Sequence, residues 1–117
     1  MALSKARARK LLLRFDDVSE APHFDRTAFR TPRRIFATLA AAGRDVNFLF
    51  DPLEQPTLCE IAPDALAPVS GGWGRLGWTR CDLKKVDEPT FLAASEAAHT
   101  RGAEARKSGR PKRRPAV

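Results

Sequence analysis

Between residues 21 and 50 the sequence alternates short runs of strand-forming residues with turn signals. The runs are rich in β-branched and aromatic side chains or alternate apolar with polar residues, and they predict strands at residues 21–25, 28–31, 35–39 and 45–50. The expected turns, which contain proline, glycine or charged residues, lie at residues 26–27, 32–34 and 40–44. This spacing predicts a β-meander, in which consecutive strands pair in antiparallel fashion.

Helix signals flank this meander. Ala8, Leu11, Leu12 and Phe15 share one face at helical spacing, which predicts an amphipathic helix over residues 4–16. An aspartate followed by a proline is typical of a helix N-terminus, and this pattern predicts a helix over residues 52–61. The same signal before Pro89 predicts a helix to about Arg101, with Gly102 as its stop.

A glycine-rich stretch, residues 71–77, leads into a predicted closing strand that extends to Leu83. Trp78, Cys81 and Leu83 cannot share one face of a regular strand, so we expect a bulge or twist there. Trp78, which precedes an apolar strand, is expected in the core, and Trp73 is the tryptophan expected to be exposed.

The chain of 117 residues, 43% of them hydrophobic, is of a size for one domain around one core. The expected domain spans residues 1–102, because residues 103–117 contain no aromatic residue and no aliphatic residue larger than alanine before Val117. We expect this last segment to be a disordered basic tail. The predicted fold is α+β, with an antiparallel sheet and helices at both ends of the domain.

The net charge of +7 is concentrated at the two ends. Residues 101–117 carry seven Lys and Arg against one Glu, and residues 1–14 carry five and no acidic residue, whereas residues 15–100 are mildly acidic. Basic segments of this kind are typical of proteins that bind polyanions. If the seven cations of residues 101–117 each neutralised one phosphate, log affinity would fall with log salt at a slope of roughly −6.

Several short patterns resemble those of the MmcQ/YjbR family of small bacterial proteins. They are Pro22-His23-Phe24, Phe29-Arg30, the stretch from Arg34 to Leu39, Asn47 before an apolar strand, and Gly77-Trp78 leading to Asp82-Leu83. The resemblance covers residues 11–102. It implies a YjbR/CyaY-like fold of the double-wing type, similar to frataxin-like proteins, in which the N- and C-terminal helices cover one face of the sheet. It also implies DNA binding, a description of the family that rests largely on fold.

The candidate nucleic-acid-binding residues fall into three groups. The first is a set of arginines on the expected first hairpin, Arg26, Arg30, Arg33 and Arg34, whose guanidinium groups suit successive phosphates. The second is the compact run in the tail, Arg110, Lys112, Arg113 and Arg114. The third surrounds the glycine-rich stretch: Trp73, with Arg75 and Arg80, as a surface on which an exposed base can stack.

Each group also has a structural interpretation. The hairpin arginines can be solvated charges at a sheet edge, with Asp25 pairing with one of them, and the tail can act only in solubility. The sequence favours neither interpretation of the hairpin arginines over the other.

No metal site, cofactor or catalytic group is expected. Cys59 and Cys81 lack the spacing of a zinc site or a disulfide framework, and His23 and His99 have no Cys or carboxylate partner at metal spacing. The first helix is basic up to Asp16, unlike the acidic helix through which frataxin-like proteins bind iron. The longest apolar run of the N-terminus, residues 11–13, is too short for a signal peptide or a membrane span, so a cytoplasmic protein without a membrane partner is expected.

The sequence therefore favours a non-catalytic, sequence-independent DNA-binding protein. The alternative is a protein-interaction or small-ligand-binding module, whose unidentified partner meets the sheet and whose tail only aids solubility or attracts nucleic acid nonspecifically.

Overall fold

The computed structural model describes residues 2–104. Its elements, in chain order, are α1 (Lys5–Leu12), β1 (Ser19–His23), β2 (Arg26–Arg30), β3 (Ile35–Ala40), β4 (Asp45–Leu49), α2 (Gln55–Ile61), β5 (Leu66–Pro68), α3 (Gly72–Arg75), β6 (Trp78–Asp82) and α4 (Glu88–Ala103). The predicted α+β class is confirmed.

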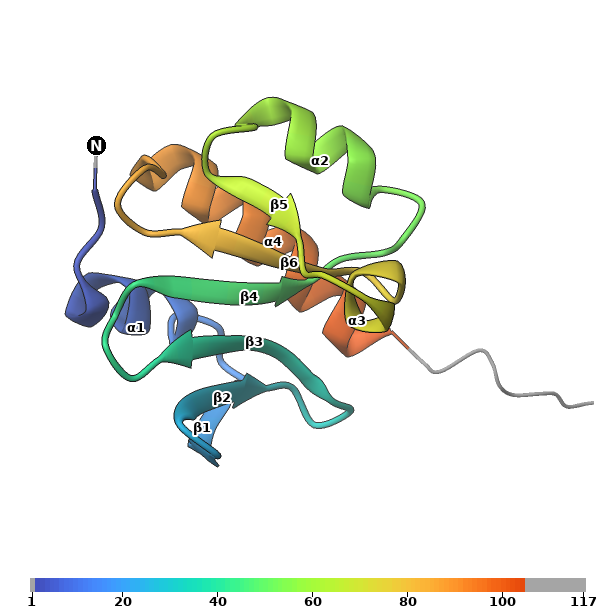
Figure 1. Ribbon diagram of the computed structural model, residues 1–117. Helices are drawn as coiled ribbons and strands as arrows, with labels where there is room; N and C mark the ends of the chain where they lie inside the picture. The colour runs from blue at the N-terminus through green and yellow to red at the C-terminus, as the bar shows by residue number, and fades with distance from the viewer. Residues whose placement is uncertain (1, 105–117) are drawn as a thin grey trace, which may run out of the picture.

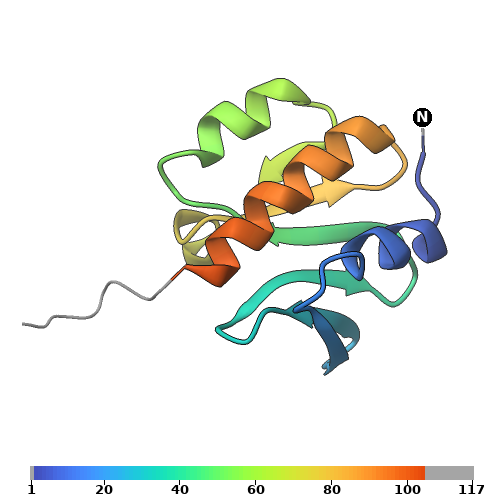
Figure 2. The same cartoon turned by 180° about the vertical axis from the view of Figure 1, so that it is seen from behind.

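The strands form one six-stranded antiparallel sheet in the order β1-β2-β3-β4-β6-β5. The meander predicted between residues 21 and 50 is confirmed as β1 to β4. Helices α1 and α4 lie on the same face of the sheet, with α4 running across β3 and β4, whereas α2 lies beside the edge strand β5 (Figures 1 and 2). Among residues 2–104, no long helix lies on the opposite face of the sheet, which we call the open face.

Side-chain caps set the starts of the two main helices. Ser4 accepts a hydrogen bond from the Arg7 amide at the start of α1, and Asp87 accepts one from the Thr90 amide at the start of α4. Such caps satisfy amide donors that have no partner within the helix. The bond from Thr90 lowers the pKa of the Asp87 carboxyl.

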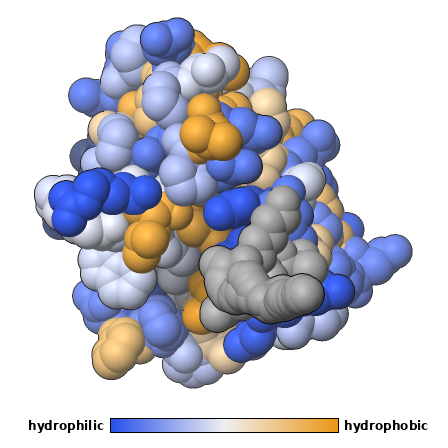
Figure 3. All heavy atoms as spheres, turned by 90° about the vertical axis from the view of Figure 1, so that its right-hand side faces the viewer, coloured by the Kyte–Doolittle hydropathy of each residue, from blue (hydrophilic) through white to orange (hydrophobic). Residues whose placement is uncertain are grey.

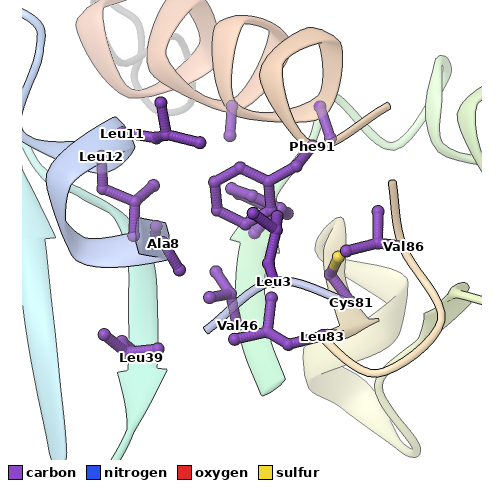
Figure 4. Close-up of a cluster of buried hydrophobic side chains, with 14 of the residues drawn as sticks. Leu3, Ala8, Leu11, Leu12, Leu39, Val46, Cys81, Leu83, Val86 and Phe91 are labelled. Carbon is purple, nitrogen blue, oxygen red and sulfur yellow. The ribbon is translucent and has the colours of Figure 1, made fainter. Parts of the chain in front are cut away.

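The core lies between the sheet and the helices α1 and α4. It is rich in phenylalanine: Phe29, Phe36, Phe48, Phe50 and Phe91 are all fully buried. The Phe48 ring lies 5.3 Å from that of Phe91, so β4 and α4 are joined by an aromatic contact. Around it pack smaller apolar side chains, among them Leu11 and Leu12 of α1, Val46 of β4 and Cys81 of β6 (Figure 4).

One turn and the closing strand differ from the prediction. Residues 26–27, expected as a turn, begin β2, and the turn between β1 and β2 consists of Phe24 and Asp25, because His23 pairs with Arg26. The expected bulge in the closing strand is also wrong. β6 pairs with β4 in unbroken register and places Trp78 on the open face and Cys81 in the core, and the strand ends at Asp82 before Leu83.

The helix predicted over residues 52–61 begins three residues later, at Gln55, because Asp51 accepts a hydrogen bond from the Leu53 amide in a preceding turn. Gly102 does not stop the last helix. It is buried in the last turn of α4, where an added Cβ would lie 2.7 Å from the Phe36 Cβ, so close packing requires glycine there. The domain end expected at residue 102 therefore falls inside α4.

Candidate nucleic-acid interface

The four hairpin arginines occupy two different places. Arg26 lies at the first position of β2, whereas Arg30 is the last residue of the strand, and Arg33 and Arg34 belong to the turn between β2 and β3. A five-residue strand separates its ends by about 13 Å. The predicted single patch is therefore divided between the two ends of β2.

Arg26 is held on the open face by neighbouring strands. Its Nε donates to the Thr38 hydroxyl over 2.8 Å, and its Nη2 lies 2.7 Å from the Asp45 carboxylate. Both partners of this ion pair are more than three-quarters buried, with 21% and 16% of the side chain exposed. The ion partner expected for this cluster was Asp25, but Asp45 takes that role for Arg26, whose side chain reaches across β3 to β4.

Arg80 of β6 binds the same carboxylate from the other side. Its Nε lies 3.3 Å from Asp45 Oδ2, and its Nη1 lies 3.8 Å from Asp82. Two arginines and two aspartates thus form one network across the open face. The positive charge of Arg26 and Arg80 is largely balanced there, which lowers their attraction for phosphate.

The other end of β2 has a different arrangement. Arg30 and Arg33 are exposed, and within residues 2–104 neither guanidinium pairs with a carboxylate. Arg34 donates to the Arg101 carbonyl over 3.0 Å, and the buried Thr31 hydroxyl donates to the Gly102 carbonyl over 2.9 Å. These bonds hold the turn against the C-terminal end of α4, where a cation also complements the helix dipole.

Two basic residues of α1 are engaged in ion pairs with other elements. Arg7 forms two hydrogen bonds with Glu88 of α4, at 2.9 and 2.7 Å, while Arg9 pairs with Glu20 of β1. The bond and charge of Arg7 lower the pKa of the Glu88 carboxyl, and those of Glu88 raise the pKa of Arg7. The N-terminal charge excess therefore serves in part to join α1 to its neighbours.

A groove lies on the open face, with a volume of about 250 Å³. It is lined by the β1–β2 turn, the middle of the sheet and the residues around α3: His23, Phe24, Asp25, Arg26, Thr38, Asn47, Val69, Trp73 and Trp78. Figure 3 views the end of the molecule that carries α3 and the C-terminal end of α4, and apolar side chains are exposed there among hydrophilic ones.

The aromatic residues of the groove are unusually accessible. Phe24 is 95% exposed and Trp73 is 65% exposed, so the predicted exposure of Trp73 is confirmed. Trp78 is half-buried and lines the groove, although the sequence predicted a core position for it. Arg75, the remaining residue of the predicted stacking group, is exposed and lines a shallow hollow beside Trp73.

Local backbone geometry fixes both sides of the groove. Phe24 has a φ of 61°, and it is the only described residue other than glycine with a positive φ. On the other side, a Cβ at Gly74 would lie 1.9 Å from the Val69 carbonyl oxygen, so α3 packs directly on the preceding loop. Only glycine allows that approach, which sets the position of Trp73. Sequence reasoning missed Phe24 as a site residue, although a phenylalanine in a tight turn is an unusual choice.

The other side chains that could take part in chemistry are two cysteines, which are partly or fully buried, and His99, which is paired with an aspartate. Burial raises the pKa of the Cys81 thiol to about 12, and it also raises that of Cys59. His99 Nε2 lies 2.8 Å from Asp17 and its ring stacks on Phe15 at 4.0 Å. Within the described part of the chain, no three His, Cys, Asp or Glu side chains are grouped as metal ligands.

His23 lines the groove together with Asp25, but no hydrogen bond joins their side chains within residues 2–104.

None of the helices in residues 2–104 is both long enough and hydrophobic enough to cross a bilayer.

The tail residues Arg110, Lys112, Arg113 and Arg114, and almost all of the tail predicted at residues 103–117, lie outside the described residues. No family model, curated protein or solved structure matches this chain.

Proposed function

We propose that the chain is a non-catalytic, sequence-independent DNA-binding protein of the MmcQ/YjbR type. The observation that carries the proposal is the position of Arg30 and Arg33. Arg30, at the end of β2, and Arg33, in the following turn, are exposed beside the turn residues that bond to the end of α4. After α4 the sequence continues with residues 105–117, which contain six Lys and Arg and no acidic residue. The exposed arginines thus lie near the end of α4, to which this basic segment is joined in the sequence.

Arginine suits phosphate at such a place because its planar guanidinium donates two parallel hydrogen bonds. Contacts with phosphate position a protein on DNA without reading bases, so this end of the domain gives affinity without sequence preference. The antiparallel sheet with terminal helices also supports the proposal, since it agrees with the fold that the resemblance implies.

The test is fluorescence anisotropy of a labelled DNA duplex over a salt series, with the full-length chain. The variant Arg30→Gln/Arg33→Gln removes the two exposed charges of the turn, and Lys10→Gln/Arg44→Gln is a matched control that removes two exposed charges elsewhere. Each lost phosphate contact reduces the salt slope by about 0.9, so the turn variant is expected to lose about 2 and the control much less. Equal changes in the two variants would contradict an interface at the turn.

The contribution of the tail is measured in the same way. Replacing Arg110, Lys112, Arg113 and Arg114 by glutamine removes four charges and is expected to reduce the slope by up to about 3.6. If that variant no longer binds and the turn variant binds like the wild type, the folded domain is not the DNA-binding part.

The alternative, a ligand-binding module, has one observation in its favour, the aromatic groove on the open face. The groove and the proposed DNA-binding end are different surfaces, so the two functions are compatible.

A further inference from the structure

We infer that the groove on the open face binds a single unpaired base of a nucleic-acid strand. The inference deepens the proposed function, on which it rests for the attraction of the strand, and it assigns the groove a preference for single-stranded over duplex DNA. Three features of the groove carry it: its exposed aromatic rings, its unengaged polar groups and its lack of net positive charge.

The aromatic rings lie on both sides of the groove. Phe24 comes from the β1–β2 turn, whereas Trp73 and Trp78 come from α3 and the start of β6. A phenylalanine that is 95% exposed contributes little to the core, and a positive φ adds backbone strain to its position. Both costs are explained if the ring contacts a ligand. Flat aromatic rings that line one groove suit a flat heterocycle, because bases stack on such side chains.

The polar groups of the groove have unused hydrogen-bonding capacity. Within residues 2–104, no hydrogen bond engages the side chains of His23, Asp25 or Asn47, although all three line the groove. An amide offers both donors and an acceptor, a carboxylate only acceptors, and an imidazole either role. The edge of a base carries the complementary donors and acceptors.

The charges of the groove favour binding of the base of a nucleotide over binding of its phosphate. Arg26 is the one arginine among the lining residues, and it is already paired with Asp45, while Asp25 adds negative charge. A phosphate would gain little there. Arg75 is exposed beside Trp73, outside the groove, where it can meet the phosphate that follows the bound base.

The size of the groove limits the ligand to one ring system. Its volume of about 250 Å³ lies just below the range of pockets for drug-sized molecules, roughly 300–1,000 Å³. In a duplex each base is stacked on both faces and paired at its edge, so it cannot enter the groove without being extruded. An unpaired base needs no such extrusion, which is the reason for the expected preference.

The chain provides its own probe for this site. It contains two tryptophans and no tyrosine, and both tryptophans line the groove. Quenching of intrinsic fluorescence therefore reports on the groove itself. We would titrate the full-length protein with a decamer of deoxythymidine, with a decamer of abasic nucleotides that carries the same phosphates, with thymidine monophosphate and with a duplex.

The decamer with bases is expected to quench the fluorescence and to bind more tightly than the abasic strand. Base stacking on one aromatic side chain changes affinity by about fivefold to 150-fold. Trp73→Ala and Phe24→Gly are therefore expected to weaken binding of the decamer within that range, as measured by anisotropy. Phe24→Gly suits the turn conformation and is therefore expected to fold. Leu53→Ala removes another exposed apolar side chain, 89% exposed and outside the groove, and serves as the control.

Equal affinity for the decamer and the abasic strand would overturn the inference, and so would unchanged binding by Phe24→Gly and Trp73→Ala. Equal affinity for the monophosphate and the decamer would overturn the assignment to a strand. These results leave the proposed DNA binding in place if Arg30→Gln/Arg33→Gln still weakens the duplex complex. Loss of that effect, with Phe24→Gly still reducing affinity for the decamer, would overturn the proposed duplex-binding interface at Arg30 and Arg33 and support the groove.

Discussion

On the face of the sheet that α1 and α4 cover, the ring of Phe48 is fully buried, whereas at the open face Phe24 is 95% exposed. Successive side chains of a strand point to opposite faces of the sheet, so neighbouring residues have different surroundings. In β4, Val46 and Phe48 enter the core, while Asp45 and Asn47 face the open side.

The two faces are also stabilised by different interactions. The covered face relies on apolar burial, which is not directional and is proportional to area. The open face relies on the ion-pair network of Asp45 with Arg26 and Arg80, which keeps its central charges matched. The fold therefore depends mainly on one face of the sheet, and the exposed aromatic residues of the other face are available for binding.

The largest expected effect comes from replacing a phenylalanine by alanine on each face and comparing the changes in the free energy of unfolding. Phe48→Ala removes a fully buried ring that contacts Phe91, and it is expected to lower the free energy of unfolding by about 3–5 kcal/mol. Phe24→Ala removes an exposed ring and is expected to change it by less than about 0.5 kcal/mol. Urea denaturation measures both values. Similar losses in the two variants would show that the open face contributes to stability as the core does.

The next effect concerns the ion-pair network of the open face. Asp45→Ala leaves Arg26 and Arg80 without their shared carboxylate and is expected to cost about 1–2 kcal/mol, because the Arg26 pair is largely buried. The same change frees positive charge, so duplex affinity at low salt is expected to rise. The control is Asp64→Ala, which removes an exposed carboxylate that forms no ion pair within residues 2–104. A rise in stability in Asp45→Ala would contradict a stabilising network.

The sequence predicted the covered face better than the open face. Strands β3 and β4 lie within one residue of their predicted bounds, because alternation with bulky apolar residues is a local signal. Strand β5, with three residues, and helix α3, with four, were missed, because elements this short show no periodicity. They depend on contacts with β6 that only the folded chain forms.

The candidate site was predicted only in part. Arg30 and Arg33 are exposed as a phosphate-binding role requires, but the pairing of Arg26 joins residues that are 19 positions apart and could not be read from its sequence neighbours. Charge partners across a sheet depend on register, and register is set by the whole sheet. The groove likewise joins the β1–β2 turn to α3, and no spacing in the sequence relates these segments.

A smaller effect is expected for an ion pair on the covered side. The pKa of Glu88 is lowered by Arg7, so protonation of Glu88 costs more in the folded state, and the pair stabilises the protein above the ordinary glutamate pKa of about 4.3. Its contribution is lost as the pH falls through that value toward the lower pKa of the folded state. Thermal unfolding of Glu88→Gln and wild type is therefore expected to differ slightly at pH 7 and to converge once the pH is below the lowered pKa of Glu88 in the folded state. A difference that persists at low pH would assign the effect to packing.

The smallest expected change in stability is a gain rather than a loss, and it tests most directly whether Phe24 on the open face serves binding. In the two-residue turn between β1 and β2, φ is positive at Phe24 and not at Asp25, a pattern typical of a type II′ turn, which favours glycine at its first central position. Phe24→Gly relieves backbone strain and removes little buried area, so it is expected to leave stability unchanged or to raise it by about 0.5–1 kcal/mol. Phe24→Ala, which keeps the strain, is the matched control and is expected to be less stable than Phe24→Gly in urea denaturation. A destabilised Phe24→Gly would show that the phenylalanine serves the fold. If Phe24→Gly is as stable as the wild type or more stable, and binds single-stranded DNA more weakly, then the strained and exposed phenylalanine at this position serves ligand binding.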